Sequence, residues 1–195
     1  GPCFLMHLLK FCDLSNLKGA HIGGALTDTW IFDEALKKWP EAEWTHVYGS
    51  SEAEPVCVVP IQESVKNSKE KGFFQTLFLG NPVKDISINN NENELWVTGD
   101  HVCPRYIGNE EENKKNKRKD DQGRVWHNMG DRIKKDDTGL WYSGRSGQEY
   151  KDFELEQNVY QFLKSSLSFI TKHKNENRLL LVGEKLKGRE EEIKK

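Results

Sequence analysis

The sequence predicts a mixed α+β protein of the α/β class, and three features of its pattern predict it. Apolar residues recur at helical spacing in residues 3–12 and 27–38. Between residues 44 and 143, short β-rich runs alternate with breaks rich in Gly, Asn and Asp, which is typical of a small, mostly antiparallel sheet or barrel. After residue 144 the pattern becomes helical again.

The elements can be assigned in chain order from the same rules. We expect a helix over residues 3–12, a strand over 18–22 and a helix over 27–38. Thr27 or Asp28 would cap the second helix, and Pro40 would end it because proline cannot continue a helix. Strands are expected over residues 44–48, 55–61, 74–79, 85–88, 94–98 and 124–126.

The remaining elements are a hairpin, a charged loop and a helical C-terminal part. The hairpin covers residues 131–143 and turns at 136–139. The basic run 113–119, flanked by acidic residues, predicts a solvated, mobile loop. A helix over 153–166 and a strand over 178–182 precede a charged tail, 184–195, that we expect to fray.

Composition and charge exclude several classes of function. The 195 residues contain 29 Lys plus Arg and 31 Asp plus Glu, a formal net charge of −2, whereas nucleic-acid binders usually carry a strongly basic face. No apolar run approaches the roughly 18 residues of a membrane span, and the first residues lack a signal-peptide pattern. The cysteines are widely spaced, without a CxxC pair: Cys3, Cys12, Cys57 and Cys103. We therefore expect a cytoplasmic protein with reduced thiols, no membrane span and no nucleic-acid partner.

Three segments carry residue types suited to chemistry, although each alone would also fit an ordinary turn. Gly24 and Ala25 lie between a strand and a helix, where small residues let a ligand approach the backbone and the helix start favours negative charge. Residues 48–52 combine an aromatic ring, a glycine, two hydroxyls and a carboxylate, groups that suit phosphate and a divalent cation. Asp131 can accept bonds from paired sugar hydroxyls, and Arg145 can bind phosphate.

The order of these segments matches a known set of motifs. Residues 23–26 are similar to Gly-Gly-Ala-Pro-Leu without the proline, and residues 48–52 to Tyr-Gly-x-Thr-Glu with serine in the threonine place. Residues 93–102 are similar to Gly-Glu-Leu-x-Val-x-Gly-x-x-Val, and residues 126–131 to Tyr-x-Thr-Gly-Asp. Residues 137–145 are similar to Asp-Gly-x-x-x-x-x-Gly-Arg. In this order the five motifs resemble the adenylate-forming, AMP-binding superfamily of acyl-CoA synthetases, luciferases and peptide-synthetase adenylation domains.

The resemblance implies a role for each matching residue. Gly24 and Ala25 would form one wall of the adenine site, and Tyr48, followed by Gly49, would stack on the base from the other side. Ser51 would contact the α-phosphate and Glu52 would hold Mg²⁺, so these two are the candidate catalytic residues. Asp131 would bind the ribose hydroxyls, and Arg145 would reach the ribose or the phosphate.

The resemblance also implies parts that these residues do not contain. A Ser/Thr/Gly-rich phosphate loop ending in Pro-Lys is absent, as is the family's catalytic lysine, and Gly147 replaces the usual acidic or Lys hinge residue. We therefore expect a fragment that is inactive alone. Residues 1–144 would be the late part of a large domain, including a small distorted antiparallel β-barrel. Residues 145–195 would be the hinge and the beginning of a small C-terminal α+β domain.

The implied parent protein is an ATP-dependent ligase that forms an acyl-adenylate, from a fatty acid by default, and passes the acyl group to coenzyme A. Residues 51–56 also resemble the pocket motif of olefin β-lactone synthetases, which act on long β-hydroxy acids. A third alternative is a non-catalytic module that binds a nucleotide or a partner weakly. A fragment would expose apolar surface, so self-association is also expected.

Overall fold

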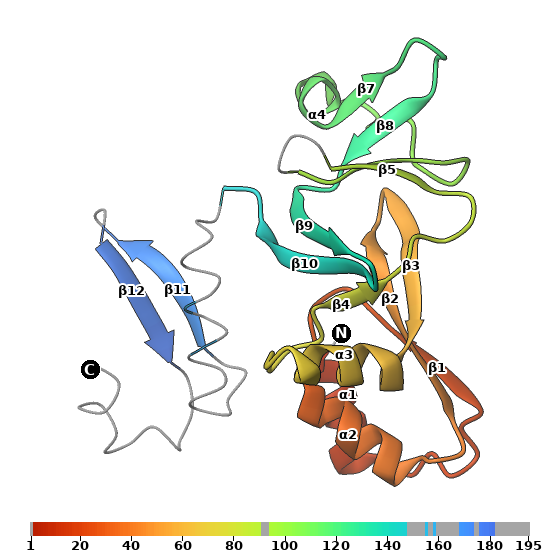
Figure 1. Ribbon diagram of the computed structural model, residues 1–195, viewed down its shortest axis with the longest axis vertical. Helices are drawn as coiled ribbons and strands as arrows, with labels where there is room; N and C mark the ends of the chain where they lie inside the picture. Colours follow the sequence, from red (N-terminus) through yellow and green to blue (C-terminus); the bar gives the residue numbers. More distant parts are fainter. Residues whose placement is uncertain are drawn as a thin grey trace. The chain divides into compact units, whose positions relative to one another are not determined.

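The computed structural model describes residues 2–90, 94–147, 155, 158, 168–173 and 176–181 (Figure 1). The chain divides into two compact units, Gly1–Gly147 and Gln148–Lys195. Every residue singled out above as a candidate site residue lies in the first unit.

Three helices and a three-stranded sheet begin the first unit. Its elements are α1 (Pro2–Phe11), β1 (Gly19–Ile22), α2 (Thr29–Lys38), β2 (Glu43–Ser50), β3 (Ala53–Pro60) and α3 (Ile61–Glu70). Strand β2 lies centrally, parallel to β1 and antiparallel to β3. Figure 1 shows the three helices gathered at one end of the unit, where Leu5, Ile31, Phe32, Trp44 and Ile61 form a buried core.

Two smaller antiparallel sheets complete the first unit. One has the strand order β4-β10-β9, with β4 (Phe78–Gly80), β9 (Asp131–Asp136) and β10 (Gly139–Arg145). The other has the order β5-β6-β8-β7, with β5 (Ser87–Asn89), β6 (Trp96–Thr98), β7 (Lys117–Lys119) and β8 (Val125–Asn128). A second buried core, which includes Val56, Leu79, Val97 and Leu140, joins these sheets to β3. The mixed α+β prediction is confirmed.

Across the described residues, the small antiparallel sheets do not close into a barrel. Strands β4 and β9 are the edges of one sheet, and β5 and β7 are the edges of the other. A backbone bond from Leu95 N to Asp131 O, 2.8 Å long, joins the two sheets at one corner, where the bond from Met129 N to Leu95 O extends the β6–β8 ladder. Elsewhere side-chain packing in the shared core holds the two sheets together, so a closed ring of backbone hydrogen bonds is not needed.

Two elements differ from the sequence predictions. Helix α3 was not expected, because its inward face carries the small polar residues Ser64 and Ser68 beside Val65. The predicted mobile loop at 113–119 is instead the end of helix α4 (Glu110–Asn116) followed by β7. The Asn109 side chain caps α4 by accepting from Glu112 N. Acidic residues in the first turn and basic residues in the last turn complement the helix dipole.

The second unit is described only in part. Strands β11 (Ser168–His173) and β12 (Glu176–Leu181) pair as an antiparallel hairpin, and β12 covers most of the strand expected at 178–182. Of the helix expected at 153–166, the structure describes only Leu155 and Asn158, both helical, and the tail 184–195 lies outside the described residues. Over the described parts of the chain, no helix is long and apolar enough to cross a membrane.

Candidate nucleotide-binding site

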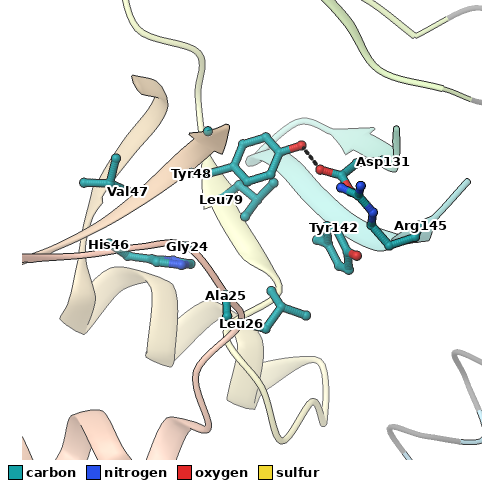
Figure 2. Close-up of a pocket in the computed structure, with 11 residues that line it drawn as sticks. Gly24, Ala25, Leu26, His46, Val47, Tyr48, Leu79, Asp131, Tyr142 and Arg145 are labelled. Carbon is teal, nitrogen blue, oxygen red and sulfur yellow. Dashed lines mark hydrogen bonds and ion pairs between the residues drawn. The ribbon is translucent and has the colours of Figure 1, made fainter. Parts of the chain in front are cut away.

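A cavity of about 190 Å³ lies where the C-terminal end of β2 meets the β1–α2 loop and the β9–β10 hairpin. Its lining includes six residues singled out by the sequence: Gly24, Ala25, Tyr48, Gly49, Asp131 and Arg145. Figure 2 shows the Tyr48 hydroxyl pointing directly at Asp131, with Ala25 and Leu26 on a neighbouring loop of the lining. The fold therefore gathers residues from three distant parts of the chain, and we call this space the nucleoside cavity.

Asp131 is the polar centre of the nucleoside cavity. Its side chain is 6% exposed, and it accepts a hydrogen bond from the Tyr48 hydroxyl over 2.7 Å. Its other oxygen accepts from Arg145 Nη1 over 2.8 Å. Burial raises the pKa of Asp131, although the bonds from Tyr48 and Arg145 act in the opposite direction. A carboxylate has about four lone-pair sites, so these two bonds leave acceptor capacity for a ligand.

Two glycines shape the walls for different reasons. Gly24 has a φ of +82°, which disfavours other residues, and a Cβ added there would meet no heavy atom within 4 Å. The backbone at Gly24 is therefore open to an approaching ligand. A Cβ added at Gly49 would lie 2.7 Å from the Ala53 carbonyl oxygen, so Gly49 permits the β2–β3 hairpin to close.

His46 also lines the nucleoside cavity, and the motif comparison did not select it. The Ser64 hydroxyl donates to the Phe78 carbonyl over 2.8 Å, so its contact with His46 Nδ1 at 3.3 Å makes Nδ1 the donor. Burial lowers the pKa of His46 to about 4, so the ring is neutral near pH 7. His46 Nε2 then carries the lone pair and can act only as an acceptor. No sequence signal pairs His46 with Ser64, because α3 brings the serine to it.

A second cavity, of about 420 Å³, adjoins the first at Arg145, which lines both. Glu52 lines this space and accepts from the Tyr106 hydroxyl over 2.8 Å. Its other oxygen lies 4.0 Å from His127 Nε2. Burial opposes ionisation of Glu52, but the hydrogen bonds that its carboxylate accepts from Tyr106 and Ser50 outweigh burial and lower its pKa. We call this space the Glu52 cavity; Tyr106 and His127 are contacts that the sequence analysis did not assign.

The hairpin turn separates the two candidate catalytic residues. Residues 51 and 52 form the tight turn between β2 and β3, and Ser50 pairs with Ala53 across it. Glu52 points into its cavity, whereas Ser51 is exposed and lines neither cavity. Ser50, one position earlier, lines the Glu52 cavity. The structure thus brings together every predicted site residue except Ser51.

The Glu52 cavity offers one carboxylate to a metal ion. Among the described residues, no cluster of three or more His, Cys, Asp and Glu side chains could hold a metal ion by itself. Mg²⁺ is commonly held by one or two carboxylates together with phosphate oxygens and water, so a single carboxylate next to a phosphate site suits it. Glu52 fits that requirement, because it is ionised and adjoins the nucleoside cavity.

Comparison with known proteins supports the fold. No protein-family model and no curated protein matches the chain. Solved structures that match include E. coli MenE with a bound phenylether-linked analogue of OSB-AMS (19% identity, TM-score 0.63). The long-chain-fatty-acid-CoA ligase FadD1 from Archaeoglobus fulgidus (20%, 0.57) also matches. So does the Vibrio cholerae adenylation domain AlmE in complex with glycyl-adenosine-5'-phosphate (15%, 0.59).

These neighbours are adenylate-forming enzymes, and the match to each is partial. They cover 92%, 96% and 92% of this chain, whereas the chain covers only 39%, 40% and 39% of theirs. The chain therefore has the fold of part of an adenylate-forming enzyme and spans about two fifths of the length of these structures.

Proposed function

We propose that the chain is part of an ATP-dependent ligase that activates a carboxylic acid as an acyl-adenylate. The observation that carries the proposal is the convergence of Gly24, Ala25, Tyr48, Asp131 and Arg145 on one cavity of a chain with this fold. We also propose that residues 1–144 belong to the large domain of the parent protein and residues 145–195 to its hinge and small C-terminal domain.

The nucleoside cavity suits adenosine in three respects. The Tyr48 ring and the open backbone at Gly24 and Ala25 would contact the two faces of a planar base. The remaining lone pairs of Asp131 would accept the two ribose hydroxyls. Charge-assisted bonds of this kind contribute about 1.5–3 kcal/mol each.

His46 would supply preference among bases. Its neutral ring presents an acceptor at Nε2, which complements the exocyclic amino group of adenine. Guanine carries a carbonyl oxygen at the same ring position, so two acceptors would face each other. A buried acceptor left without a donor is destabilising, so we expect AMP to bind more tightly than GMP.

The phosphates would extend from the nucleoside cavity past Arg145 toward Glu52. Arg145 lines both cavities, and its guanidinium can bind phosphate oxygens. Glu52 would hold Mg²⁺, which neutralises phosphate charge when bound. Attack of a carboxylate on the α-phosphate depends mainly on positioning and charge neutralisation. Ser51 remains a proposed α-phosphate contact that would require a rearrangement of the hairpin turn.

The proposal includes the identity of the acyl substrate and of the acyl acceptor. A fatty acid passed to coenzyme A is favoured by the likeness to FadD1, a long-chain-fatty-acid-CoA ligase. A β-lactone product from a long β-hydroxy acid is the alternative. Cytoplasmic location and self-association are proposed too; Phe4 and Phe11, each 64% exposed on α1, favour self-association.

ATP–pyrophosphate exchange with a panel of carboxylic acids tests the proposal. A longer protein that contains this chain should show acid-dependent exchange, and product analysis should then separate a thioester from a lactone. The 195-residue chain alone should show none, since it lacks the phosphate loop and the lysine. Acid-independent ATP hydrolysis by the longer protein would refute the ligase assignment. No turnover at all would also refute it and would leave a non-catalytic nucleotide-binding module.

A further inference from the structure

A third cavity, of about 320 Å³, lies along α4 and β7 and shares no lining residue with the nucleoside and Glu52 cavities. We call it the α4 groove. Its charged lining residues are Arg105, Glu110, Lys114, Lys117, Arg118 and Lys119. Pro104 and Val125 supply apolar surface. The proposed nucleotide chemistry does not use this groove.

The α4 groove carries a positive formal charge, whereas the whole chain carries a small negative one. Five basic residues and one acidic residue give it a formal charge of +4, whereas the whole chain carries −2. Like charges that line the same groove repel one another and raise the positive potential there. An anion bound between them would relieve that repulsion.

Two of the cations are held in place before any ligand binds. The Arg118 guanidinium lies over the Trp96 ring, 4.0 Å from its centroid. Lys117 Nζ donates to the Cys103 carbonyl over 2.6 Å and lies 5.1 Å from the Tyr106 ring centroid. Both groups are held against residues beside the groove, so the ligand contacts are assigned to Arg105, Lys114 and Lys119.

The residue types indicate phosphate as the ligand chemistry. Arginine matches phosphate oxygens with paired donors, and lysine adds compact positive charge. The three cations Arg105, Lys114 and Lys119 exceed what one carboxylate needs, so a ligand with clustered phosphates fits best. The rings of Trp96 and Tyr106 already carry basic side chains, so the groove does not offer them for base stacking.

The surroundings limit the size of the ligand. Acidic residues 110–112 precede the basic run, and Asp120 and Asp121 follow it. Asp120 forms an ion pair with Arg124, which offsets its charge. The remaining acidic residues on both sides of the basic run would repel a long anion that extended beyond the groove. We propose that the α4 groove binds a small soluble ligand that carries two or more clustered phosphate groups.

Titration of the whole chain with inorganic tripolyphosphate by calorimetry tests the proposal. The measurement is made at about 10 mM ionic strength, where charges act over roughly 30 Å. The test variant is Lys114→Ala/Lys119→Ala, and the control is Lys18→Ala/Lys84→Ala, which removes the same charge at two exposed lysines outside the groove. We expect saturable binding that weakens at least about tenfold in the test variant and less than about twofold in the control. AMP affinity should stay unchanged in both.

Three outcomes would overturn the proposal. Equal weakening in both variants would indicate non-specific charge attraction, and absence of saturable binding to the unaltered chain would remove the site. A single-stranded oligonucleotide that binds at least about tenfold more tightly than tripolyphosphate, and depends on Lys114 and Lys119, would make the groove a nucleic-acid surface. Circular dichroism of each variant verifies that the fold is retained.

Discussion

The contact between Tyr48 and Asp131 allows the structural and binding roles of Asp131 to be separated. Tyr48→Phe removes the hydroxyl that donates to Asp131 over 2.7 Å but keeps the ring that would stack on adenine. Asp131→Asn keeps an acceptor for Tyr48 but removes the negative charge that would bind the ribose. Tyr48→Phe should therefore reduce stability more than Asp131→Asn does, and Asp131→Asn should reduce nucleotide affinity more than Tyr48→Phe does.

The magnitudes follow from exposure and charge. Tyr48→Phe deletes a buried hydrogen bond to a charged group, which costs about 1.5–3 kcal/mol of unfolding free energy. Asp131→Asn loses the ion pair with Arg145, whose side chain is 64% exposed, so that pair contributes only about 0–1 kcal/mol. For AMP affinity, we expect the larger loss in Asp131→Asn and the smaller loss in Tyr48→Phe. Asp131→Asn should weaken binding at least about tenfold, or roughly 1.4 kcal/mol, and Tyr48→Phe less than about threefold.

Urea unfolding and an AMP titration of each variant measure the two effects. All six tryptophans lie in the first unit, so tryptophan fluorescence reports on that unit alone. If Tyr48→Phe weakens AMP as much as Asp131→Asn does, Asp131 acts by supporting the cavity wall and not by binding ribose. If neither variant changes AMP affinity, the nucleoside cavity is not the nucleotide site.

Three further predictions concern ionisable groups. In a longer active protein, Glu52→Gln should slow adenylate formation at least about tenfold, or roughly 1.4 kcal/mol of barrier; unchanged turnover would remove Glu52 from the mechanism. The pKa of His46 is lowered to about 4 by burial, so its contribution to stability is complete above about pH 6.5 and falls toward pH 4. The urea midpoint should fall over that range less steeply in His46→Gln, and an identical slope would contradict the account. Hydrogen bonds from the Trp126 indole and from Arg124 lower the pKa of Asp120 to about 2. The indole NH signal of Trp126 should therefore shift only as the pH falls from about 4 toward 2, and a shift that persists in Asp120→Asn would refute this.

The sequence predicts those site residues that stand in short local motifs. Tyr48, Asp131 and Arg145 each stand in a short motif with a distinctive order, and the fold brings them into one cavity. The sequence did not predict His46 or Tyr106 as site residues, because neither is close in sequence to its partner. His46 contacts Ser64, and Tyr106 donates to Glu52. Only the packing of α3 on β2 and the path of the chain before α4 create these pairs.

The fold shows a similar division. The apolar periodicity of α1 and α2 predicts both helices, because their inward faces are strongly apolar. Helix α3 buries serines, so its periodicity is weak. Helix α4 buries no side chain and thus has no apolar stripe. Its signal lay in the cap at Asn109 and the acidic-to-basic order of its turns, which a reading based on charge runs alone assigns to a loop.

The most direct test of the central claim is a nuclear magnetic resonance titration of the isotope-labelled 195-residue chain with AMP and, separately, GMP. Saturable shifts are expected with AMP at the amides of Gly24, Gly49 and Asp131, which line the nucleoside cavity. The dissociation constant should be on the order of millimolar, or about 4 kcal/mol, and GMP should bind more weakly. Absence of AMP shifts at these amides up to about 10 mM, or saturable shifts confined to other residues, would contradict the assignment of this cavity to adenosine.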